Sequence, residues 1–261
     1  MKAAILCGGR GTRIREVSDL IPKPMVLIGD KPILWHIMKS YAACGITEFV
    51  LLLGYKGDAI REFFLNFAAH TTDVTIDLSR TDADRLTFHG VPSEPWKVTL
   101  VDTGEHAMTG ARLRRARRFL EDSETFCATY GDGVGDIDMA ALLAFHRAHG
   151  KLATVTGVLP PGRFGELSVQ DGEVQKFSEK PQVSGGRING GFFVFQREVL
   201  ERVLDDREDL ILEREPMEKL AAARELMMYR HDGFWQPMDT PREYQLLNEL
   251  WASGQAPWKI W

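Results

Sequence analysis

A short apolar run at the start of the chain, Lys2–Leu6, stops at glycines and is followed by alternating helix-like and strand-like segments. Lys31–Cys44 has apolar residues at helical spacing, Phe49–Leu53 is continuously apolar, and Asp58–Ala68 is again helix-like. A continuous apolar run is typical of a strand that is buried on both faces of a parallel sheet. The order strand, helix, strand, helix therefore predicts an α/β fold with a doubly wound, mostly parallel, Rossmann-like sheet and right-handed crossovers.

The rest of the chain continues this alternation and adds short β-rich segments. Further strands are expected at Val74–Leu78, Val98–Val101, Thr125–Tyr130, Leu152–Val158 and Gly191–Phe195, and a hairpin over Leu167–Phe177. Further helices are expected at Met108–Leu120, Asp138–His149, Arg197–Leu204, Pro216–Arg224 and Pro241–Ala252. No long linker or repeat interrupts residues 1–261, so we expect one domain in which β-rich insertions shape one side of a cleft.

Composition excludes several classes of function. Of the 261 residues 44% are hydrophobic, and the net charge of −5 offers no basic field for nucleic acid. For the dense basic run Arg112–Arg118 a solvated helix face is favoured, and phosphate contact by one member is the alternative. Three cysteines without a close pair favour buried thiols over a disulfide or a zinc site. We find no signal segment and no apolar run of about 20 residues, and we expect a cytoplasmic protein.

The first candidate site is the glycine-rich loop Gly8-Gly9-Arg10-Gly11-Thr12-Arg13, which follows the first strand directly. Glycines let backbone N–H groups approach phosphate oxygens, and arginine neutralises phosphate charge with forked donors. The loop lacks the third glycine of a dinucleotide fingerprint, which disfavours a Rossmann dehydrogenase, and the chain contains no G-x-x-x-x-G-K-[ST] loop. A phosphate cradle and a tight turn with solvent-facing arginines both stay open at this point.

Single charged residues at loop positions form the next candidates. Two prolines flank Lys23 and fix its backbone, which suits a point-charge contact to phosphate; a surface loop is the alternative. Asp132 lies between glycines at the expected carboxyl end of a strand, where it could hold Mg²⁺ or form an Asx turn. Asp239 is a possible second metal carboxylate, but the residues alone favour a helix N-cap, with Thr240 as the rival cap.

Three weaker signals complete the set. His146 and His149 have the i, i+3 spacing of a possible metal pair, but we expect them to be surface histidines. Glu179-Lys180-Pro181 offers charged groups at a strand end, and Asn189-Gly190-Gly191 offers an amide that suits hydrogen bonds to sugar hydroxyls. Ordinary loop residues are the alternative interpretation of both runs.

Together these segments resemble the sugar-phosphate nucleotidyltransferase family over nearly the whole chain. The runs that carry the resemblance, in the family's order and spacing, are Leu6–Arg13, Pro22–Met25, Tyr130–Gly133, Glu179–Pro181 and Asn189–Gly191. The resemblance implies that the β-rich insertions form the sugar side of the cleft. Residues 1–135 would be mainly the nucleotide-binding half, and residues 136–261 mainly the sugar-phosphate-binding half and C-terminal tail. Cys7 departs from the alanine that is usual in the family, and the region 77–93 matches poorly.

The resemblance also implies roles for individual residues. Arg13, Lys23 and Asp132 would act at the reacting centre. Asp132 and Asp239 would hold Mg²⁺, which reverses the cap interpretation of Asp239. The nucleotide-binding residues would be Leu6, Gly8, Gly9, Arg10, Gly11, Thr12, Arg13, Lys23, Thr109, Gly110, Arg112 and Gly131. The sugar-phosphate-binding residues would be Glu179, Lys180, Asn189 and Gly190.

A second set of segments narrows the resemblance to the branch of this family that uses CTP and α-D-glucose 1-phosphate. These segments are Lys31–Met38, Pro95–Gly104, Pro160–Gly165, Gly233–Thr240 and Ala256–Lys259. The resemblance implies CDP-glucose as the product, a place in the biosynthesis of O-antigen and other surface polysaccharides, and a homo-oligomer, trimeric or hexameric. Trp251, Trp258 and Trp261 suggest a C-terminal tail that docks either on its own domain or on another subunit.

The expected reaction is direct in-line attack of a sugar 1-phosphate oxygen on the α-phosphorus of CTP. That oxygen is already ionised near neutral pH, so the protein has to neutralise charge and align the reactants rather than supply a base. Two alternatives stay open. One is the same chemistry with UTP, dTTP or another sugar 1-phosphate. The other is a non-catalytic sugar-nucleotide-binding module, against which the combination of Arg13, Lys23, Asp132 and Asp239 argues.

Overall fold

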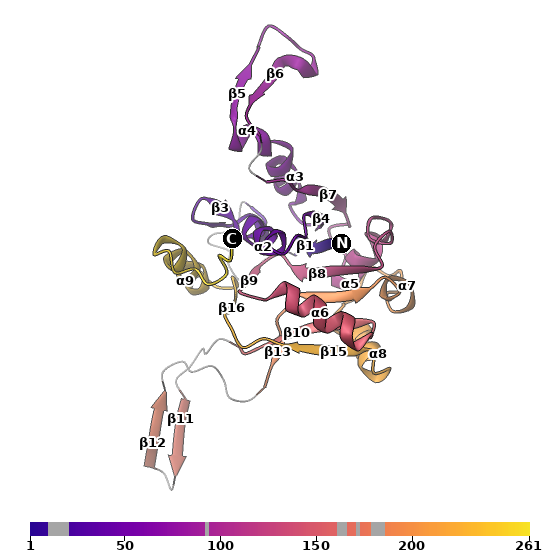
Figure 1. The fold of residues 1–261 in the computed structure, drawn as a ribbon, viewed down its shortest axis with the longest axis vertical. Coiled ribbons are helices and arrows are strands. Elements are labelled where there is room, and N and C mark those ends of the chain that lie inside the picture. Colours follow the sequence, from indigo (N-terminus) through magenta and orange to yellow (C-terminus); the bar gives the residue numbers. More distant parts are fainter. Residues whose placement is uncertain (10–20, 92–93, 161–165, 171–172, 179–185) are drawn as a thin grey trace.

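The computed structural model describes residues 1–9, 21–91, 94–160, 166–170, 173–178 and 186–261. Its centre is an eight-stranded mixed sheet in the order β13-β10-β14-β8-β1-β4-β7, with β15 beside β10 (Figure 1). The strands of this sheet are β1 Lys2–Leu6, β4 Glu48–Leu53, β7 Lys97–Asp102, β8 Thr125–Tyr130, β10 Ala153–Val158, β13 Ile188–Asn189, β14 Phe193–Gln196 and β15 Leu226–Arg230.

The direction of the strands divides the sheet into two parts. Strands β8, β1, β4 and β7 pair in parallel, as does β10 with β15. Strand β14 pairs antiparallel with both β8 and β10, and β13 pairs antiparallel with β10. The predicted Rossmann-like α/β fold is therefore confirmed, with the antiparallel strands contributed by the second half of the chain.

Helices cover both faces of this sheet. Successive side chains of β1 point to opposite faces of the sheet. Ala3 and Ile5 belong to a first apolar cluster on one face, and Ala4 and Leu6 belong to a second cluster on the other face. Helices α2 Ile33–Ala42, α3 Gly57–Leu65, α6 Met139–His149 and α9 Pro241–Ala252 contribute to the first cluster. Helices α5 Thr109–Arg115, α7 Val199–Arg202 and α8 Glu215–Ala222 contribute to the second. Burial on both faces explains why the parallel strands are continuously apolar.

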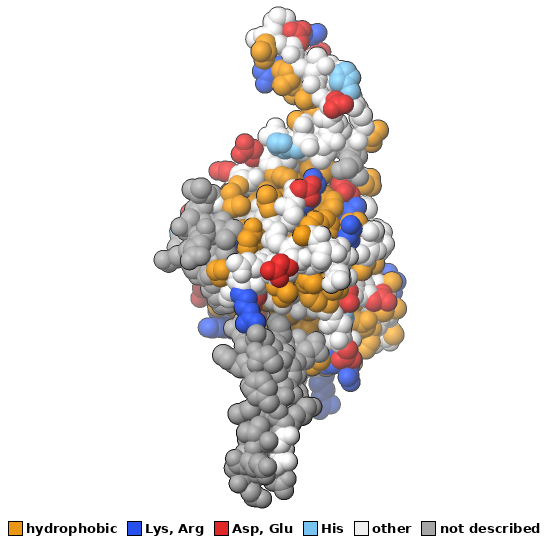
Figure 2. Space-filling model, turned by 90° about the vertical axis from the view of Figure 1, so that its left-hand side faces the viewer, with side chains coloured by type: hydrophobic (Ala, Val, Ile, Leu, Met, Phe, Trp, Pro, Cys, Tyr) orange, Lys and Arg blue, Asp and Glu red, His pale blue; other side chains and the backbone are white. Residues whose placement is uncertain are grey.

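Short ribbons decorate this core. They are β2 Leu27–Ile28 with β3 Lys31–Pro32, β5 Asp73–Ile76 with β6 Leu86–His89, β9 Gly133–Gly135 with β16 Trp235–Pro237, and β11 Glu166–Gln170 with β12 Glu173–Ser178. The β11–β12 ribbon confirms the predicted hairpin. The β5–β6 ribbon, which follows the short helix α4 Phe67–Thr71, projects from one end of the molecule (Figure 1). Hydrophobic side chains lie on its surface (Figure 2), among them the exposed Ile76, Leu78 and Phe88.

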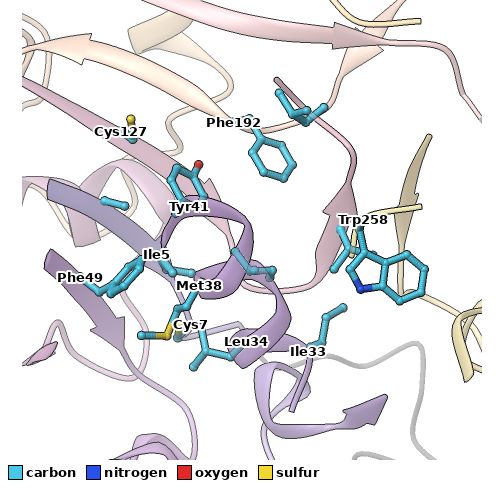
Figure 3. Packing of buried hydrophobic residues seen from close by; sticks show 14 of the residues in the cluster. Ile5, Cys7, Ile33, Leu34, Met38, Tyr41, Phe49, Cys127, Phe192 and Trp258 are labelled. Atoms are coloured by element: carbon cyan, nitrogen blue, oxygen red, sulfur yellow. The ribbon is translucent and has the colours of Figure 1, made fainter. Parts of the chain in front are cut away.

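The C-terminal tail packs on its own domain. Trp258 is fully buried in the first cluster, near Ile33 and the rest of α2 (Figure 3). His36 of α2 lies against it, with its ring centroid 4.5 Å from that of Trp251 and 6.2 Å from that of Trp258. Of the two docking places considered for these tryptophans, the domain itself is the one observed.

Several sequence expectations need correction. The helix expected over 108–120 ends at Arg115 and is followed by the 3₁₀ turn η3 Arg117–Phe119, and β15 and β16 were not predicted. The expectation of surface histidines is wrong for His146, which is fully buried. Both of its ring nitrogens have polar partners: Nδ1 lies 2.8 Å from Thr154 Oγ1, and Nε2 lies 3.2 Å from Gln196 Nε2. His149 is half-buried on the same Thr154.

The remaining global expectations concern thiols and membranes. Cys7 and Cys127 are buried, as expected, whereas Cys44 is only half-buried; all three are free thiols. In the part of the chain that the structure describes, no helix is both long enough and apolar enough to cross a membrane.

Candidate active site

The carboxyl ends of β1 and β8 form the floor of the candidate site. Leu6 lies opposite Tyr130 in the parallel ladder, and the amide of Gly131 continues the ladder by donating to the Leu6 carbonyl at 3.0 Å. A Cβ on Gly131 would lie 2.9 Å from that carbonyl oxygen and 3.0 Å from Pro24. Residue 131 therefore has to be glycine so that three chain segments can meet beneath Asp132.

Lys23 is buried at the centre of this floor. It begins the 3₁₀ turn η1 Lys23–Met25, and only 8% of the residue is exposed. Its Nζ lies 2.6 Å from Asp132 Oδ2 and also donates to Asp239 Oδ1. Burial favours the neutral amine, but the two carboxylates outweigh it and raise the pKa of Lys23 above its ordinary value. The surface-loop alternative is therefore wrong, and Lys23 is a fixed, charged ammonium.

The β9–β16 ribbon brings Asp239 to Asp132. Gly133 pairs with Pro237 in this antiparallel ribbon, and the amide of Met238 donates to the Asp132 carbonyl at 2.8 Å. Asp239 follows Met238 directly, just beyond the end of β16, and lies beside the same Lys23. A ribbon between segments about 100 residues apart in sequence thus creates the pair of carboxylates.

The N-cap of α9 is Thr240 rather than Asp239. The Thr240 hydroxyl accepts the amide of Glu243 at 3.3 Å, and the Glu243 carboxylate accepts the amides of Thr240 at 2.9 Å and of Asp239 at 2.7 Å. This is a complete capping box. The cap interpretation of Asp239, favoured by the residues alone, is wrong; its carboxylate faces Lys23 instead.

The pair Asp132 and Asp239 fits a divalent metal such as Mg²⁺. Both carboxylates converge on one cationic atom, Lys23 Nζ, so their oxygens already surround a position that favours positive charge. Within the described residues no group of three or more His, Cys, Asp or Glu side chains could hold a metal ion. Two carboxylates without a closed cage match the preference of Mg²⁺, which fills its remaining positions with water and substrate phosphates.

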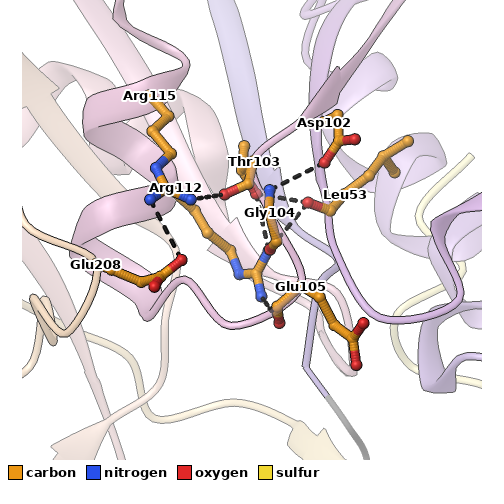
Figure 4. Close-up of polar contacts among 8 residues, drawn as sticks. All are labelled: Leu53, Asp102, Thr103, Gly104, Glu105, Arg112, Arg115 and Glu208. Atoms are coloured by element: carbon orange, nitrogen blue, oxygen red, sulfur yellow. Dashed lines mark hydrogen bonds and ion pairs between the residues drawn. The ribbon is translucent and has the colours of Figure 1, made fainter.

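Arg112 links the end of β4 to the segment that follows β7 (Figure 4). Its side chain is buried, and its guanidinium donates to the carbonyls of Leu53, Gly104, Gly8 and Glu105 and to the hydroxyl of Thr103, at 2.8 to 3.2 Å. A Cβ on Gly8 or on Gly54 would lie 2.2 Å from this guanidinium. The solvated-face interpretation is wrong for Arg112, and its contact with a nucleotide stays a prediction.

The start of α5 is tied to the segment that precedes α8. The amides of Gly110 and Ala111 donate to the Leu210 carbonyl at 2.9 and 3.1 Å, and the Thr109 hydroxyl donates to Glu213 Oε2 at 2.6 Å. The Thr109 hydroxyl and the Gly110 amide thus both donate hydrogen bonds within the protein. Their predicted contact with a nucleotide stays a prediction.

A bulge between β13 and β14 shapes the other side of the site. Gly191 and Phe192 both have left-handed backbone conformations, with φ of 75° and 47°. The amide of Gly191 donates to Asn189 Oδ1 at 2.9 Å, and the Trp235 indole donates to the Gly190 carbonyl at 2.8 Å. Phe192 is held in this conformation by stacking on Tyr41, with ring centroids 5.9 Å apart (Figure 3). Bulges of this kind direct side chains into sites, and this one leaves Asn189 exposed.

The structure thus brings together one part of the predicted site. Leu6, Gly8, Lys23, Gly131, Asp132 and Asp239 gather at the ends of β1, β8 and β16, and Gly9 is exposed beside them. Arg10, Gly11, Thr12, Arg13, Glu179 and Lys180 lie outside the described residues. Sequence reasoning missed Glu213 entirely, because it lies in a segment without a motif. Tyr130 belongs to the run Tyr130–Gly133, and its position at the end of β8 could have marked it as a residue that faces the site.

Comparison with known proteins identifies the family. The family model described as nucleotidyl transferase matches residues 2–244. The chain belongs to the nucleotidyl transferase family. This nucleotidyl transferase is 51% identical to a protein of Salmonella typhi named glucose-1-phosphate cytidylyltransferase, over the full length of both chains. It is 46% identical, again over the full length of both, to a Bacillus subtilis protein named probable glucose-1-phosphate cytidylyltransferase.

Solved structures show the same fold at lower identity. The structure of a putative glucose-1-phosphate thymidylyltransferase from Bacillus anthracis superposes on this chain with a TM-score of 0.69 and 17% sequence identity. The match covers 96% of this chain and 94% of the other. At this identity the likeness concerns the fold, and it agrees with the mixed sheet described above.

Proposed function

We propose that this nucleotidyl transferase transfers the cytidylyl group of CTP to α-D-glucose 1-phosphate, giving CDP-glucose and pyrophosphate. One observation carries the proposal: a buried, charged Lys23 holds two carboxylates, Asp132 and Asp239, at the carboxyl ends of parallel strands. Sheets of this type bind ligands at those ends. Full-length identity of 51% to a glucose-1-phosphate cytidylyltransferase supports the choice of CTP and glucose 1-phosphate.

The reaction requires alignment and charge neutralisation but no proton transfer. A phosphate oxygen of glucose 1-phosphate forms a bond to the α-phosphorus of CTP. The bond from that phosphorus to the oxygen of the β-phosphate breaks, and pyrophosphate leaves with the electron pair. Both reactants are anions, so fixed positive charge and a fixed approach supply most of the catalysis.

Lys23 is suited to this task. An ammonium has three N–H donors, and the carboxylates of Asp132 and Asp239 accept two of them. Among the described residues the third donor has no further acceptor, so it can bind a phosphate oxygen. Its raised pKa keeps the charge on Lys23. Asp132 and Asp239 would hold Mg²⁺, which when bound neutralises phosphate charge. Arg13 is proposed to act with Lys23 and Asp132 at the reacting centre.

We also propose binding roles for the remaining candidate residues. Residues 1–135 are proposed to bind mainly the nucleotide, through the glycine-rich loop with Leu6, Thr109, Gly110, Arg112 and Gly131. Residues 136–261 are proposed to bind mainly the sugar phosphate, through Glu179, Lys180, Asn189 and Gly190. The exposed amide of Asn189 and the Trp235 indole beside Gly190 support the second assignment.

The cellular setting is proposed as well. The protein acts in the cytoplasm, in the synthesis of CDP-glucose for surface polysaccharides such as O-antigen, and it forms a trimer or hexamer. The exposed Ile76, Leu78 and Phe88 on the projecting β5–β6 ribbon support self-association, since exposed apolar clusters often mark interfaces.

Release of pyrophosphate from purified protein tests the proposal. We expect release with CTP, glucose 1-phosphate and Mg²⁺, and much slower release when UTP or dTTP replaces CTP or when another sugar 1-phosphate replaces glucose 1-phosphate. A preference for another pair would assign the same chemistry to other substrates. Nucleotide binding without pyrophosphate release would show a binding module instead.

A further inference from the structure

The half-buried carboxylate of Glu213 lies between the two sides of the site. It belongs to the segment that joins α7 to α8. Its Oε1 accepts the hydroxyl of Tyr130 at 2.6 Å, and its Oε2 accepts that of Thr109 at 2.6 Å. One carboxylate therefore fixes the end of β8, two residues before Asp132, and the start of α5. Hydrogen bonds to an ionised acceptor are short and strong, which makes this link a stiff one.

The Tyr130 hydroxyl extends the link to Asn189. It accepts from Asn189 Nδ2 at 3.0 Å while it donates its own proton to Glu213. An ionised carboxylate can only accept and a tyrosine hydroxyl carries one proton, so this proton goes to Glu213 and the hydroxyl oxygen accepts from Asn189. The direction of both hydrogen bonds is therefore fixed, and the Asn189 amide is held with its nitrogen toward Tyr130.

The other atoms of Asn189 are then assigned. Its Oδ1 accepts the amide of Gly191 at 2.9 Å, and one N–H of Nδ2 goes to Tyr130. An amide nitrogen has two N–H donors. The second donor of Asn189 has no acceptor among the described residues, so it can bind a ligand. Because Asn189 is exposed, this donor can meet a bound sugar phosphate.

Glu213 is itself held in place. The amide of its neighbour Leu212 donates to the Thr109 hydroxyl at 2.9 Å, which closes a small ring with the side chain of Glu213. The Leu210 carbonyl accepts the amide of Gly110 at 2.9 Å. The backbone before Glu213 is thus anchored on α5, and its carboxylate meets Tyr130 from a fixed direction.

We propose that Glu213 is a positioning residue for the transfer: through Tyr130 it orients the Asn189 amide that receives the sugar phosphate. The inference rests on the proposed function, because it takes Asn189 as a sugar-phosphate contact. Glu213 touches neither substrate. Its negative charge matters because a carboxylate accepts two hydroxyl donors at once, whereas an amide at the same place would present one donor to a hydroxyl and reverse that bond.

Three variants test the link by steady-state kinetics with each substrate varied in turn. Tyr130→Phe and Glu213→Gln should each raise KM for glucose 1-phosphate about tenfold, since each removes a hydrogen bond to a charged group. In Tyr130→Phe, KM for CTP should stay within about twofold. The double variant should be no worse than the worse single one, because both substitutions cut the same link.

Two matched controls make the same atomic changes elsewhere. Glu225→Gln alters a half-buried carboxylate that accepts the amide of Leu152 at 3.1 Å, and Tyr229→Phe alters a half-buried tyrosine on β15. Both should keep the KM of the wild type for glucose 1-phosphate. If Glu213→Gln unfolds at the assay temperature, Tyr130→Phe alone decides, because it removes one oxygen and keeps the ring.

The outcomes separate the inference from the proposed function. If the wild type uses glucose 1-phosphate and Tyr130→Phe has an unchanged KM for it, Glu213 has no positioning role. Additive effects in the double variant, or equal effects in the controls, would overturn the inference as well. If the wild type releases no pyrophosphate with glucose 1-phosphate, the proposed substrate is wrong, and the same comparison is then made with the sugar phosphate that the wild type does use.

Discussion

At the scale of single residues, the first two glycines of the glycine-rich loop differ in their surroundings. Gly8 is packed against the Arg112 guanidinium, which itself is locked by bonds to backbone carbonyls. Gly9 is exposed, and a Cβ there would have no atom of the described residues within 4 Å. The sequence pattern treats the two alike, whereas the structure gives only Gly8 a steric role.

This contrast predicts unequal effects on stability. Gly8→Ala should lower the free energy of unfolding by about 1 to 3 kcal/mol, because the new methyl group displaces the buried guanidinium. Gly9→Ala, its neighbour, should change it by less than about 0.5 kcal/mol. Urea unfolding of both variants checks the prediction. Equal losses in the two variants would mean that Arg112 yields easily and does not fix the loop.

At the scale of elements, the junction between β16 and α9 combines two functions in consecutive residues. Thr240 caps the helix, and Asp239 faces Lys23. The capping box also fixes the backbone of Asp239, since the Glu243 carboxylate accepts its amide at 2.7 Å. Stability of the helix end and the direction of a candidate metal ligand are therefore coupled.

Thr240→Ala should accordingly destabilise the protein by about 1 kcal/mol, the usual cost of losing an N-cap hydroxyl. Thermal unfolding measures this loss. Ser253→Ala is the control at the other end of the same helix, because its hydroxyl is exposed and donates to the nearby Leu250 carbonyl at 3.1 Å. A Thr240→Ala variant as stable as Ser253→Ala would contradict the role of the capping box.

The elements that sequence reasoning located well are those with local signals. Pro241–Ala252 was predicted to the residue, since a proline at the first helical position and a capping threonine mark its start. β16 was missed because its three residues have no pattern of their own and pair only with the distant β9. The left-handed Phe192 could not be foreseen either, because contacts with distant segments stabilise it: its ring stacks on Tyr41, and its backbone forms hydrogen bonds with the side chains of Thr129 and Thr156.

The candidate site divides in the same way. Lys23 and Asp132 were identified from flanking prolines and glycines, which are local. Asp239 required the resemblance, because its local signal equally fits a cap and only the β9–β16 ribbon brings it to Lys23. Arg112 looked like part of a charged helix face, since its backbone acceptors come from segments far away in the sequence.

At the scale of the whole molecule, two buried histidines link stability to pH. His36 and His146 are both fully buried, and burial lowers the pKa of each to about 4 from an ordinary 6.5. In the unfolded chain both regain their ordinary pKa. Between the two values the unfolded state binds more protons than the folded one, so stability falls as pH falls through this window.

We therefore expect Tm to drop between about pH 7.5 and about pH 5, a range above the titration of most carboxylates. Scanning calorimetry across this range measures the drop. His146→Gln should reduce the drop, because it removes one of the histidines whose pKa is lowered in the folded state. A Tm that stays level or rises toward pH 5 would contradict the account of these buried rings.

The central claim is that the cluster of Lys23, Asp132 and Asp239 is the reacting centre for cytidylyl transfer. The most direct test compares pyrophosphate release by wild type and Asp132→Asn with CTP, glucose 1-phosphate and saturating Mg²⁺. The account predicts CDP-glucose formation by the wild type and turnover at least about a hundredfold slower in the variant, which should still fold. Turnover by Asp132→Asn within a few-fold of the wild type would contradict it.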